Sequence, residues 1–200
     1  MSDLHGKVVL VTGAGRGLGR TLAKALAERG ATVAANDLTP IHIDTLVEEI
    51  EAQGGTAKAY LADVSKKLAL QTMLNEVLDD WGRVDMLVNH AEVEPDDALL
   101  DMDEWDWRRT LDVNLTGVFT VMQSVGRVMR AQGGGLIVNL LVENPRGAAY
   151  AASKGGLAAL TRAAAEELAS DSIRVELVTY RKGETQSGVE AVLELLVTGS

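Results

Sequence analysis

The chain has 200 residues, of which 46% are hydrophobic, enough for one domain with a substantial core but too few for two comfortable ones. Its net charge of -10, from 29 acidic and 19 basic residues, would repel a phosphate backbone, so nucleic acid is not an expected partner. Without cysteine, the chain cannot form disulfides, thiolate metal sites or a thiol nucleophile, which fits a reducing compartment.

The beginning of the chain lacks the long apolar core and cleavage site of a secretory signal. No apolar run approaches the length needed to span a bilayer. The histidines and carboxylates show no spacing typical of a metal cluster. We therefore expect a cytoplasmic protein with no membrane association and no metal site.

Short apolar runs alternate with longer stretches of helical periodicity, and no linker or repeat interrupts them. This alternation is typical of βαβ units wound on a parallel sheet, so residues 1–200 are predicted to form a single α/β domain. The predicted strands are Lys7–Val11, Thr32–Asn36, Ala57–Leu61, Met86–Val88, Leu136–Leu140 and Arg174–Val178. The predicted helices are Leu18–Arg29, Ile41–Gln53, Lys66–Trp81, Glu104–Gln132, Ala148–Ala169 and Val189–Val197.

A glycine-rich turn joins the first predicted strand to the first predicted helix, in the sequence VVLVTGAGRGLGRTLAKALAERG. Gly13, Gly17 and Gly19 follow the spacing G-x-x-x-G-x-G, with Gly15 as an extra glycine. Glycines at such a turn let the backbone approach a pyrophosphate, while the helix N-terminus offers free amides and a positive dipole end. We expect a dinucleotide site here, with tight packing of the turn as the alternative.

An acidic residue, Asp37, closes the second predicted strand 18 residues after Gly19. At about this distance a carboxylate accepts a hydrogen bond from the ribose 2′-hydroxyl of NAD and repels the 2′-phosphate of NADP. Arg16 argues the other way, because a guanidinium in the glycine turn could reach such a phosphate. We expect NAD to be preferred over NADP, since two facing anions are costly to desolvate. The alternative for Asp37 is an ordinary helix N-cap.

Five blocks of sequence, taken in order, resemble the short-chain dehydrogenase/reductase family from about Lys7 to Val178. They are TGAGRGLG (Thr12–Gly19), ADV (Ala62–Val64), VDMLVNHA (Val84–Ala91), DVNLTGVF (Asp112–Phe119) and YAASK (Tyr150–Lys154). The resemblance implies a Rossmann-type, doubly wound parallel sheet of about six strands with helices on both faces. It also implies a nicotinamide cofactor, with hydride transfer between its C4 and a carbonyl or alcohol carbon of a small molecule.

The resemblance also assigns roles to individual residues. Asp63 and Val64 would flank the adenine, and Asn114 would bend its helix and position a water in a proton relay. The full set of cofactor-binding residues implied is Gly13, Arg16, Gly17, Leu18, Gly19, Asp37, Asp63, Val64, Asn89, Ala91, Tyr150 and Lys154.

Tyr150 and Lys154 are the implied acid–base pair, and their chemistry can be checked physically. A free phenol has a pKa near 10 and is a poor base at neutral pH. Lys154 lies one helical turn along on the same face. At about 4 Å and an effective dielectric of about 20, its charge would favour phenolate by up to about 4 kcal/mol before its own desolvation is counted. We predict that Tyr150 is the acid/base, Lys154 its activator and Asn114 part of the relay; a solvated helix face is the alternative.

One part of the family pattern is absent. A serine after the fifth strand normally donates a hydrogen bond to the reacting oxygen, but Leu141 or Val142 occupies that place here. Ser124 lies in the preceding helix and cannot substitute for it without distortion. Loss of one such donor typically costs about 100- to 1000-fold in rate. Asn139, Asn144 or a backbone amide could supply the bond instead, although roles in the strand and turn fit the two asparagines better.

Two further departures lie near the expected cofactor. His90 and Glu92 replace an amide and a glycine of the family pattern; the new carboxylate is expected to weaken pyrophosphate binding, and His90 to be a structural residue. Tyr180 and Arg181 replace a proline-glycine turn, and the chain then runs almost directly into its last helix. The usual substrate lid and a seventh strand are therefore expected to be missing, leaving the site open to water.

These observations leave two functions open. The first is an NAD(P)-dependent oxidoreductase acting on a ketone or secondary alcohol, favoured because both members of the proton pair are present. The second is a cofactor-binding or assembly module whose catalysis is impaired by the missing serine. The segment LAALTRAAAEELA has a broad small-residue face, and the resemblance implies that such helices pair into a homodimer or homotetramer, with packing onto the sheet as the alternative.

Overall fold

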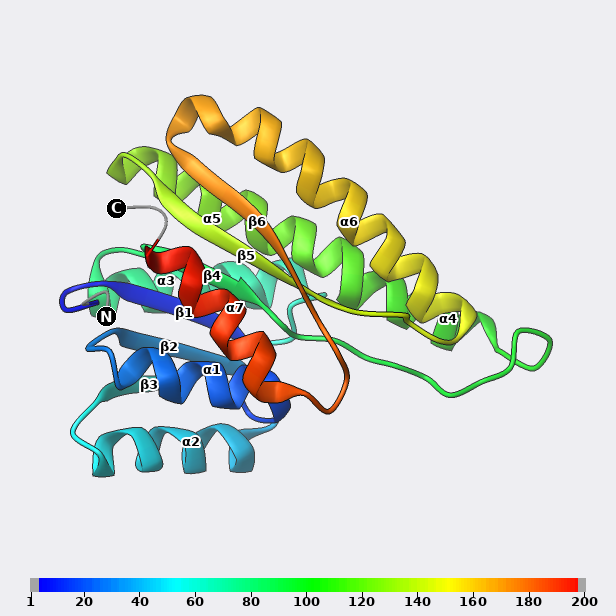
Figure 1. The fold of residues 1–200 in the computed structure, drawn as a ribbon, viewed down its shortest axis with the longest axis horizontal. Helices are drawn as coiled ribbons and strands as arrows, with labels where there is room; N and C mark the ends of the chain where they lie inside the picture. The colour runs from blue at the N-terminus through cyan, green and yellow to red at the C-terminus, as the bar shows by residue number, and fades with distance from the viewer. Residues whose placement is uncertain (1–3, 198–200) are drawn as a thin grey trace.

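The computed structural model describes residues 4–197, which form a three-layer α/β fold around one parallel sheet (Figure 1). The strand order is β3-β2-β1-β4-β5-β6, as in a doubly wound Rossmann sheet. The strands are β1 (Val8–Thr12), β2 (Thr32–Asp37), β3 (Thr56–Leu61), β4 (Met86–Asn89), β5 (Gly135–Val142) and β6 (Ile173–Tyr180). The predicted fold class is therefore confirmed.

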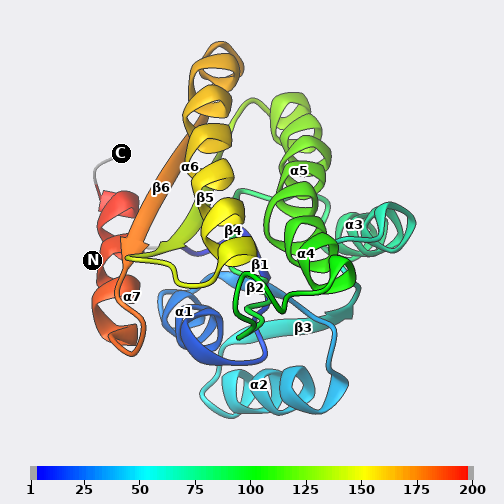
Figure 2. The same ribbon diagram turned by 90° about the vertical axis from the view of Figure 1, so that its right-hand side faces the viewer.

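Helices cover both faces of the sheet (Figure 2). One core packs the sheet against α1 (Gly17–Ala27), α2 (Pro40–Ala52) and α7 (Thr185–Val197). The other core packs it against α3 (Lys67–Trp81), α5 (Val118–Gln132) and α6 (Ala148–Leu168). Because both faces are covered, the central strand β1 is buried throughout its length, which explains its run of hydrophobic residues from Val8 to Val11.

The predicted helix Glu104–Gln132 is divided into three consecutive segments. It begins as α4 (Glu104–Leu111), continues as the π-helical segment η1 (Asp112–Gly117) and ends as α5. A π turn carries one extra residue per hydrogen-bonded ring and often marks a functional position. Asn114 lies inside η1, so the irregularity falls where the family resemblance places a bend.

The other predicted boundaries agree with the structure to within two residues, except for the start of the last helix. The strand β6 runs on through Tyr180, beyond the predicted end at Val178. The helix α7 begins at Thr185 instead of Val189, so only residues 181–184 join it to β6. Within residues 4–197 the sheet has six strands.

The order of strands reverses between β1 and β4, and this reversal positions the site. Thr12 at the end of β1 pairs with Asn36 of β2 on one side and with Asn89 of β4 on the other. Connections leave this edge in opposite directions, which opens a crevice at the carboxyl ends of the strands. The long connection from β4 to α4 starts here and extends well beyond the sheet (Figure 1, green).

None of the helices within residues 4–197 has both the length and the apolar character to cross a bilayer.

Candidate active site

A cavity of about 410 Å³ lies in this crevice, at the carboxyl ends of the central strands. Eight of the predicted cofactor residues line it: Gly13, Arg16, Gly17, Leu18, Asp37, Asp63, Val64 and Ala91. Gly19, Asn89, Tyr150 and Lys154 are predicted cofactor residues that do not line it. The predicted residues of the glycine turn, with Asp37 and Asp63, therefore line the cavity, whereas the predicted acid–base pair does not.

The glycines of the turn have different functions. A Cβ on Gly13 would come within 2.8 Å of the Ala91 backbone, and one on Gly19 within 2.5 Å of the Gly13 carbonyl oxygen. These two positions need glycine because the turn packs against protein. Gly17, with φ +55°, faces open space within 4 Å and lies on the cavity wall. Gly17 therefore leaves the room that a phosphate requires.

The N-terminus of α1 faces the same cavity. Arg16 is its N-cap residue, its side chain makes no capping hydrogen bond, and the first turn of α1 carries no acidic residue. The first amides of α1 thus have no side-chain acceptor at the cap and can hold an anion. The glycine turn, the open space at Gly17 and this helix end together fit the phosphates of a dinucleotide.

Asp37 is bound to the glycine turn itself. Its Oδ2 accepts a hydrogen bond from the Gly15 amide at 2.9 Å, and its Oδ1 accepts one from the Thr39 amide at 3.0 Å. The N-cap position of α2 belongs to Thr39, so the interpretation of Asp37 as an N-cap is wrong. Asp37 lines the cavity beside Arg16, which is exposed. The carboxylate therefore fixes the turn and still presents its charge to the cavity.

Asp63 forms an ion pair that the sequence did not reveal. Its Oδ2 lies 3.0 Å from Nη1 of Arg109, and the same guanidinium nitrogen donates to Ser65 Oγ at 2.7 Å. Burial raises the pKa of Asp63, but hydrogen bonds from Ser65 and the charge of Arg109 outweigh it and hold this pKa below its ordinary value. Arg109, in α4, also lines the cavity. The charged carboxylate therefore anchors the Arg109 cation on the cavity wall.

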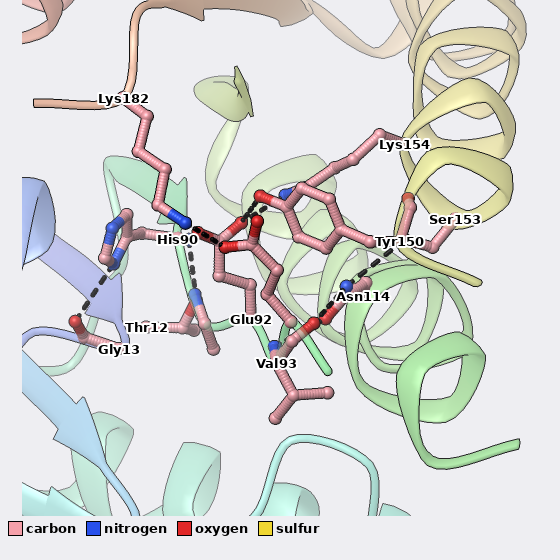
Figure 3. Close-up of polar contacts among 12 residues, drawn as sticks. Thr12, Gly13, His90, Glu92, Val93, Asn114, Tyr150, Ser153, Lys154 and Lys182 are labelled. Atoms are coloured by element: carbon pink, nitrogen blue, oxygen red, sulfur yellow. Dashed lines mark hydrogen bonds and ion pairs between the residues drawn. The ribbon is translucent and has the colours of Figure 1, made fainter. Parts of the chain in front are cut away.

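Tyr150 and Lys154 converge on one carboxylate oxygen of Glu92, a residue that lines the cavity (Figure 3). The Tyr150 hydroxyl donates to Glu92 Oε2 at 2.8 Å, and Lys154 Nζ lies 2.5 Å from the same oxygen. Lys154 Nζ is also 5.2 Å from the centroid of the Tyr150 ring. The predicted acid–base pair is thus assembled, with a carboxylate between its members.

This carboxylate changes the acid–base properties of the pair. Burial raises the pKa of Tyr150, and the charge and hydrogen bond of Glu92 raise it further. The expectation that Lys154 acidifies the phenol is therefore wrong for this arrangement, because Glu92 neutralises the ammonium. Burial also raises the pKa of Glu92, but Lys154 more than offsets this, and the net shift of that pKa is downward. Tyr150 is held protonated and Glu92 charged.

Asn114 and Asn139 are both buried, with different partners. Asn114, inside η1, donates to Ser153 Oγ at 3.2 Å and also binds the backbone of Val93. Asn139 donates to Thr161 Oγ1 at 2.9 Å and is completely inaccessible to solvent. Asn139 is therefore not available to replace the missing serine, and the suggestion that it does so is wrong.

Asn89 lies beneath the cavity, and its Nδ2 donates to Asn139 Oδ1 at 2.8 Å. Its own Oδ1 is buried and has no hydrogen-bond partner among residues 4–197. An unpaired buried acceptor is costly, so a donor supplied by a ligand or a water would be favourable at this position.

His90 holds the glycine turn in place. Its Nδ1 lies 3.0 Å from the carbonyl oxygen of Gly13, so Nδ1 carries the proton and donates. Burial lowers the pKa of His90, which keeps the ring neutral. Its backbone amide donates to Thr12 Oγ1 at 3.1 Å. Glu92, expected near the pyrophosphate, binds the acid–base pair instead.

The residues in place of the proline-glycine turn border the cavity. Tyr180 and Lys182 both line it, and Lys182 Nζ binds Glu94 Oε2 at 2.5 Å. Arg181 turns outward and pairs with Glu143 at 3.0 Å. The Lys182–Glu94 pair connects the β6–α7 turn to the β4–α4 connection, so two segments distant in sequence meet at this edge of the cavity.

Comparison with known proteins gives consistent results. Residues 7–191 match the family model for the short chain dehydrogenases. The 3-oxoacyl-[acyl-carrier-protein] reductase FabG of Thermotoga maritima is 39% identical over 180 residues, which cover 88% of this chain and 73% of that protein. The enzyme of the same name from Staphylococcus epidermidis is 42% identical over 178 residues, covering 86% of this chain and 73% of that protein.

A solved structure extends the likeness to three dimensions. A metagenomic short-chain oxidoreductase in complex with NADP superposes with a TM-score of 0.92 at 34% identity, covering 98% of this chain and 92% of that one. The likeness therefore spans nearly the whole chain, including the segments around the cavity.

Proposed function

The chain belongs to the short-chain dehydrogenase family, and from this premise we propose that it is a nicotinamide-dependent oxidoreductase that interconverts a ketone and a secondary alcohol. One observation carries the proposal. The Tyr150 hydroxyl and the Lys154 ammonium point at a single oxygen atom, 2.8 and 2.5 Å away, beside the cavity that the glycine turn borders. An oxygen of a substrate at that position would face a proton donor and a positive charge.

The chemistry of the pair follows from this placement. When bound, the nicotinamide supplies or accepts the hydride. Tyr150 then donates its phenolic proton to the carbonyl oxygen during reduction, or receives the hydroxyl proton during oxidation. Lys154 stabilises negative charge on either oxygen, an effect that is stronger in a site of low dielectric. Asn114 fixes the position of this end of α6 through Ser153.

We propose NAD as the preferred cofactor. Gly17 and the first amides of α1 would hold the phosphates, and Asp37 would accept a hydrogen bond from the adenosine ribose. The charge of Asp37 disfavours a 2′-phosphate at the same place. Arg16 beside it, and the NADP found in the related metagenomic oxidoreductase, make NADP the competing outcome.

The substrate proposed for the first assays is a 3-oxoacyl thioester, because the two relatives described above are named as 3-oxoacyl-[acyl-carrier-protein] reductases.

We also propose that the chain is a cytoplasmic homodimer or homotetramer. A surface groove of about 430 Å³ between α5 and α6, with Phe119, Leu160 and Ala164 in its wall, supports such an assembly. Light scattering on the purified protein would test it, and a monomer would refute it.

The test of the function uses binding and turnover together. NADH and NADPH are titrated by fluorescence, and a panel of 3-oxoacyl thioesters, simple ketones and secondary alcohols is assayed with wild type and Tyr150→Phe. We expect unchanged cofactor affinity and a fall in turnover of about 100-fold or more in the variant. Tyr60→Phe, which removes a phenolic hydroxyl outside the cavity, is the control and should retain turnover.

Two outcomes would contradict the proposal. Turnover that is the same in wild type and Tyr150→Phe would exclude Tyr150 as the acid. Cofactor binding without turnover of any compound in the panel would favour a cofactor-binding or assembly module, which the comparisons do not support.

A further inference from the structure

Glu92 separates the acid–base pair from the cavity. Its side chain lies on the cavity wall, whereas Tyr150 and Lys154 do not reach that wall. Only 1% of Tyr150 and 4% of Lys154 are exposed to solvent. Figure 3 shows Glu92 between His90, which also lines the cavity, and the phenol of Tyr150. A substrate in the cavity therefore meets Glu92 before it meets Tyr150.

The Glu92 carboxylate also occupies the two hydrogen-bond donors that a substrate oxygen would need, the Tyr150 hydroxyl and the Lys154 ammonium. A single atom, Glu92 Oε2, accepts both the phenolic hydrogen at 2.8 Å and the ammonium at 2.5 Å. A hydroxyl donates only one hydrogen bond, so Tyr150 cannot bind Glu92 and a carbonyl oxygen at the same time. A charge-assisted contact of this kind is about twice as strong as a neutral one.

The other charged and titratable groups around Tyr150 leave Glu92 as its direct partner. Glu94, two residues along the same segment, is committed to Lys182. Tyr180, at the end of β6, faces the pair as a neutral phenol, and His90, on the other side of Glu92, is neutral and bound to the glycine turn. Lys154 is therefore the cation that holds Glu92 in place, and the three groups together carry no net charge.

We propose that Glu92 is an internal carboxylate ligand of the Tyr150–Lys154 pair: its Oε2 occupies the position of the substrate oxygen and must be displaced before Tyr150 can act. Glu92 is thus a positioning residue that competes with the substrate. The proposal rests on the proposed function only in taking Tyr150 as the acid. It also defines a ligand class, since the pair should bind a small free carboxylate once the side chain is removed.

The first test follows the ionisation of Tyr150 by ultraviolet difference spectroscopy and needs neither cofactor nor turnover. The chain has three tyrosines, and burial raises the pKa of each. In Glu92→Ala the pKa of Tyr150 should fall, because Lys154 loses its counter-ion and favours the phenolate. A new tyrosinate step should therefore appear at lower pH than in wild type, and it should disappear in Glu92→Ala/Tyr150→Phe.

The second test asks whether a free carboxylate restores the contact. Increasing sodium acetate should move the new step in Glu92→Ala back to higher pH, whereas sodium chloride at equal ionic strength should not. Glu92→Gln keeps the shape of the side chain without its charge. In that variant the step should also lie at lower pH than in wild type, but acetate should have no effect because the position remains filled.

The third test measures competition during turnover. Removing an internal competitor should lower the KM for the carbonyl substrate in Glu92→Ala by about 10-fold or more, with a smaller change in kcat. Glu94→Ala is the matched control, since it removes a carboxylate of the same segment that binds Lys182 instead. Its tyrosinate titration should shift far less than that of Glu92→Ala, because Glu94 makes the smallest of the contributions that raise the pKa of Tyr150, and its KM should remain close to that of wild type.

The proposal would be overturned if the tyrosinate titration of Glu92→Ala matched that of wild type, or if acetate had no greater effect than chloride on that variant. A KM in Glu92→Ala equal to that of wild type would also refute it. Failure of the proposed function is distinguishable, because a protein without turnover would still give the titration and the acetate result.

Discussion

Asn114 and Val93 form a reciprocal pair of hydrogen bonds. The amide Oδ1 of Asn114 accepts from the Val93 backbone nitrogen, and its Nδ2 donates to the Val93 carbonyl oxygen, both at 2.9 Å. One side chain in η1 thus satisfies both polar groups of a residue in the β4–α4 connection. Because Glu92 immediately precedes Val93, this pair also fixes the segment that positions the carboxylate against Tyr150.

Replacing Asn114 should therefore destabilise the fold. In Asn114→Ala the partly buried Val93 amide and carbonyl lose their partners, and at about 1–2 kcal/mol for each partly buried group a total loss of about 2–4 kcal/mol is expected. Urea denaturation of variant and wild type measures it. Thr116→Ala, an exposed change in the same segment, is the control and should stay within about 0.5 kcal/mol of wild type. A loss below about 1 kcal/mol in Asn114→Ala would refute this account of η1.

Asp37 is predicted to set the choice between NAD and NADP. Asp37→Asn removes the charge but keeps one acceptor oxygen, which can still bind the Gly15 amide while the hydrogen bond from the Thr39 amide is lost, so the glycine turn should survive. The affinity for NADPH relative to NADH should rise about 10-fold, equivalent to about 1.4 kcal/mol. Fluorescence titration of both cofactors measures the ratio. Asp44→Asn, an exposed change in α2, should leave the ratio unchanged, and an unchanged ratio in Asp37→Asn would exclude the assigned role.

Tyr60 is predicted to limit stability at alkaline pH. Its hydroxyl donates to Asp80 at 2.6 Å and accepts from Trp81 Nε1 at 2.7 Å. Burial, followed by the hydrogen bond to Asp80, raises the pKa of Tyr60 in the folded state. Because the unfolded phenol has a pKa near 10, the contribution of Tyr60 to stability is fully present below about pH 10 and is lost as pH rises toward its folded-state pKa.

The corresponding variant is Tyr60→Phe. At about pH 8 it should lose about 1–2 kcal/mol, because Trp81 and Asp80 lose their partner. The difference in the free energy of unfolding should shrink between about pH 8 and about pH 11, since the phenol of unfolded wild type ionises in this range and the folded phenol does not, whereas the variant has no such phenol. Urea denaturation across this range measures it. A difference that stays constant or grows with pH would show that Tyr60 does not lose its contribution to stability as the pH rises.

Local patterns in the sequence were sufficient to predict the fold, the glycine turn and the shared helix face of Tyr150 and Lys154. Buried parallel strands read as apolar runs, and the glycine turn marks where the first strand meets its helix. The i, i+4 spacing of Tyr150 and Lys154 predicts that they share a helix face. Each of these features depends on neighbours in sequence, so no knowledge of tertiary contacts is needed.

The parts that could not be predicted depend on contacts between distant segments. Glu92 meets Tyr150 across 58 positions of sequence, and Arg109 meets Asp63 across 46. The departure from the family pattern at Glu92 was visible, but the direction of its side chain was not. As a result, the pKa of Tyr150 was expected to fall, although a carboxylate from another segment cancels the charge of Lys154.

The most direct test of the account is hydride transfer itself. The reaction is run with NADH that carries deuterium at C4 on both positions, with the ketone that the assay panel identifies, and the alcohol product is analysed by mass spectrometry. The account predicts one deuterium on the carbinol carbon in wild type and a loss of labelled product of about 100-fold or more in Tyr150→Phe. Alcohol formed without deuterium, or labelled product at equal rates in both proteins, would contradict it.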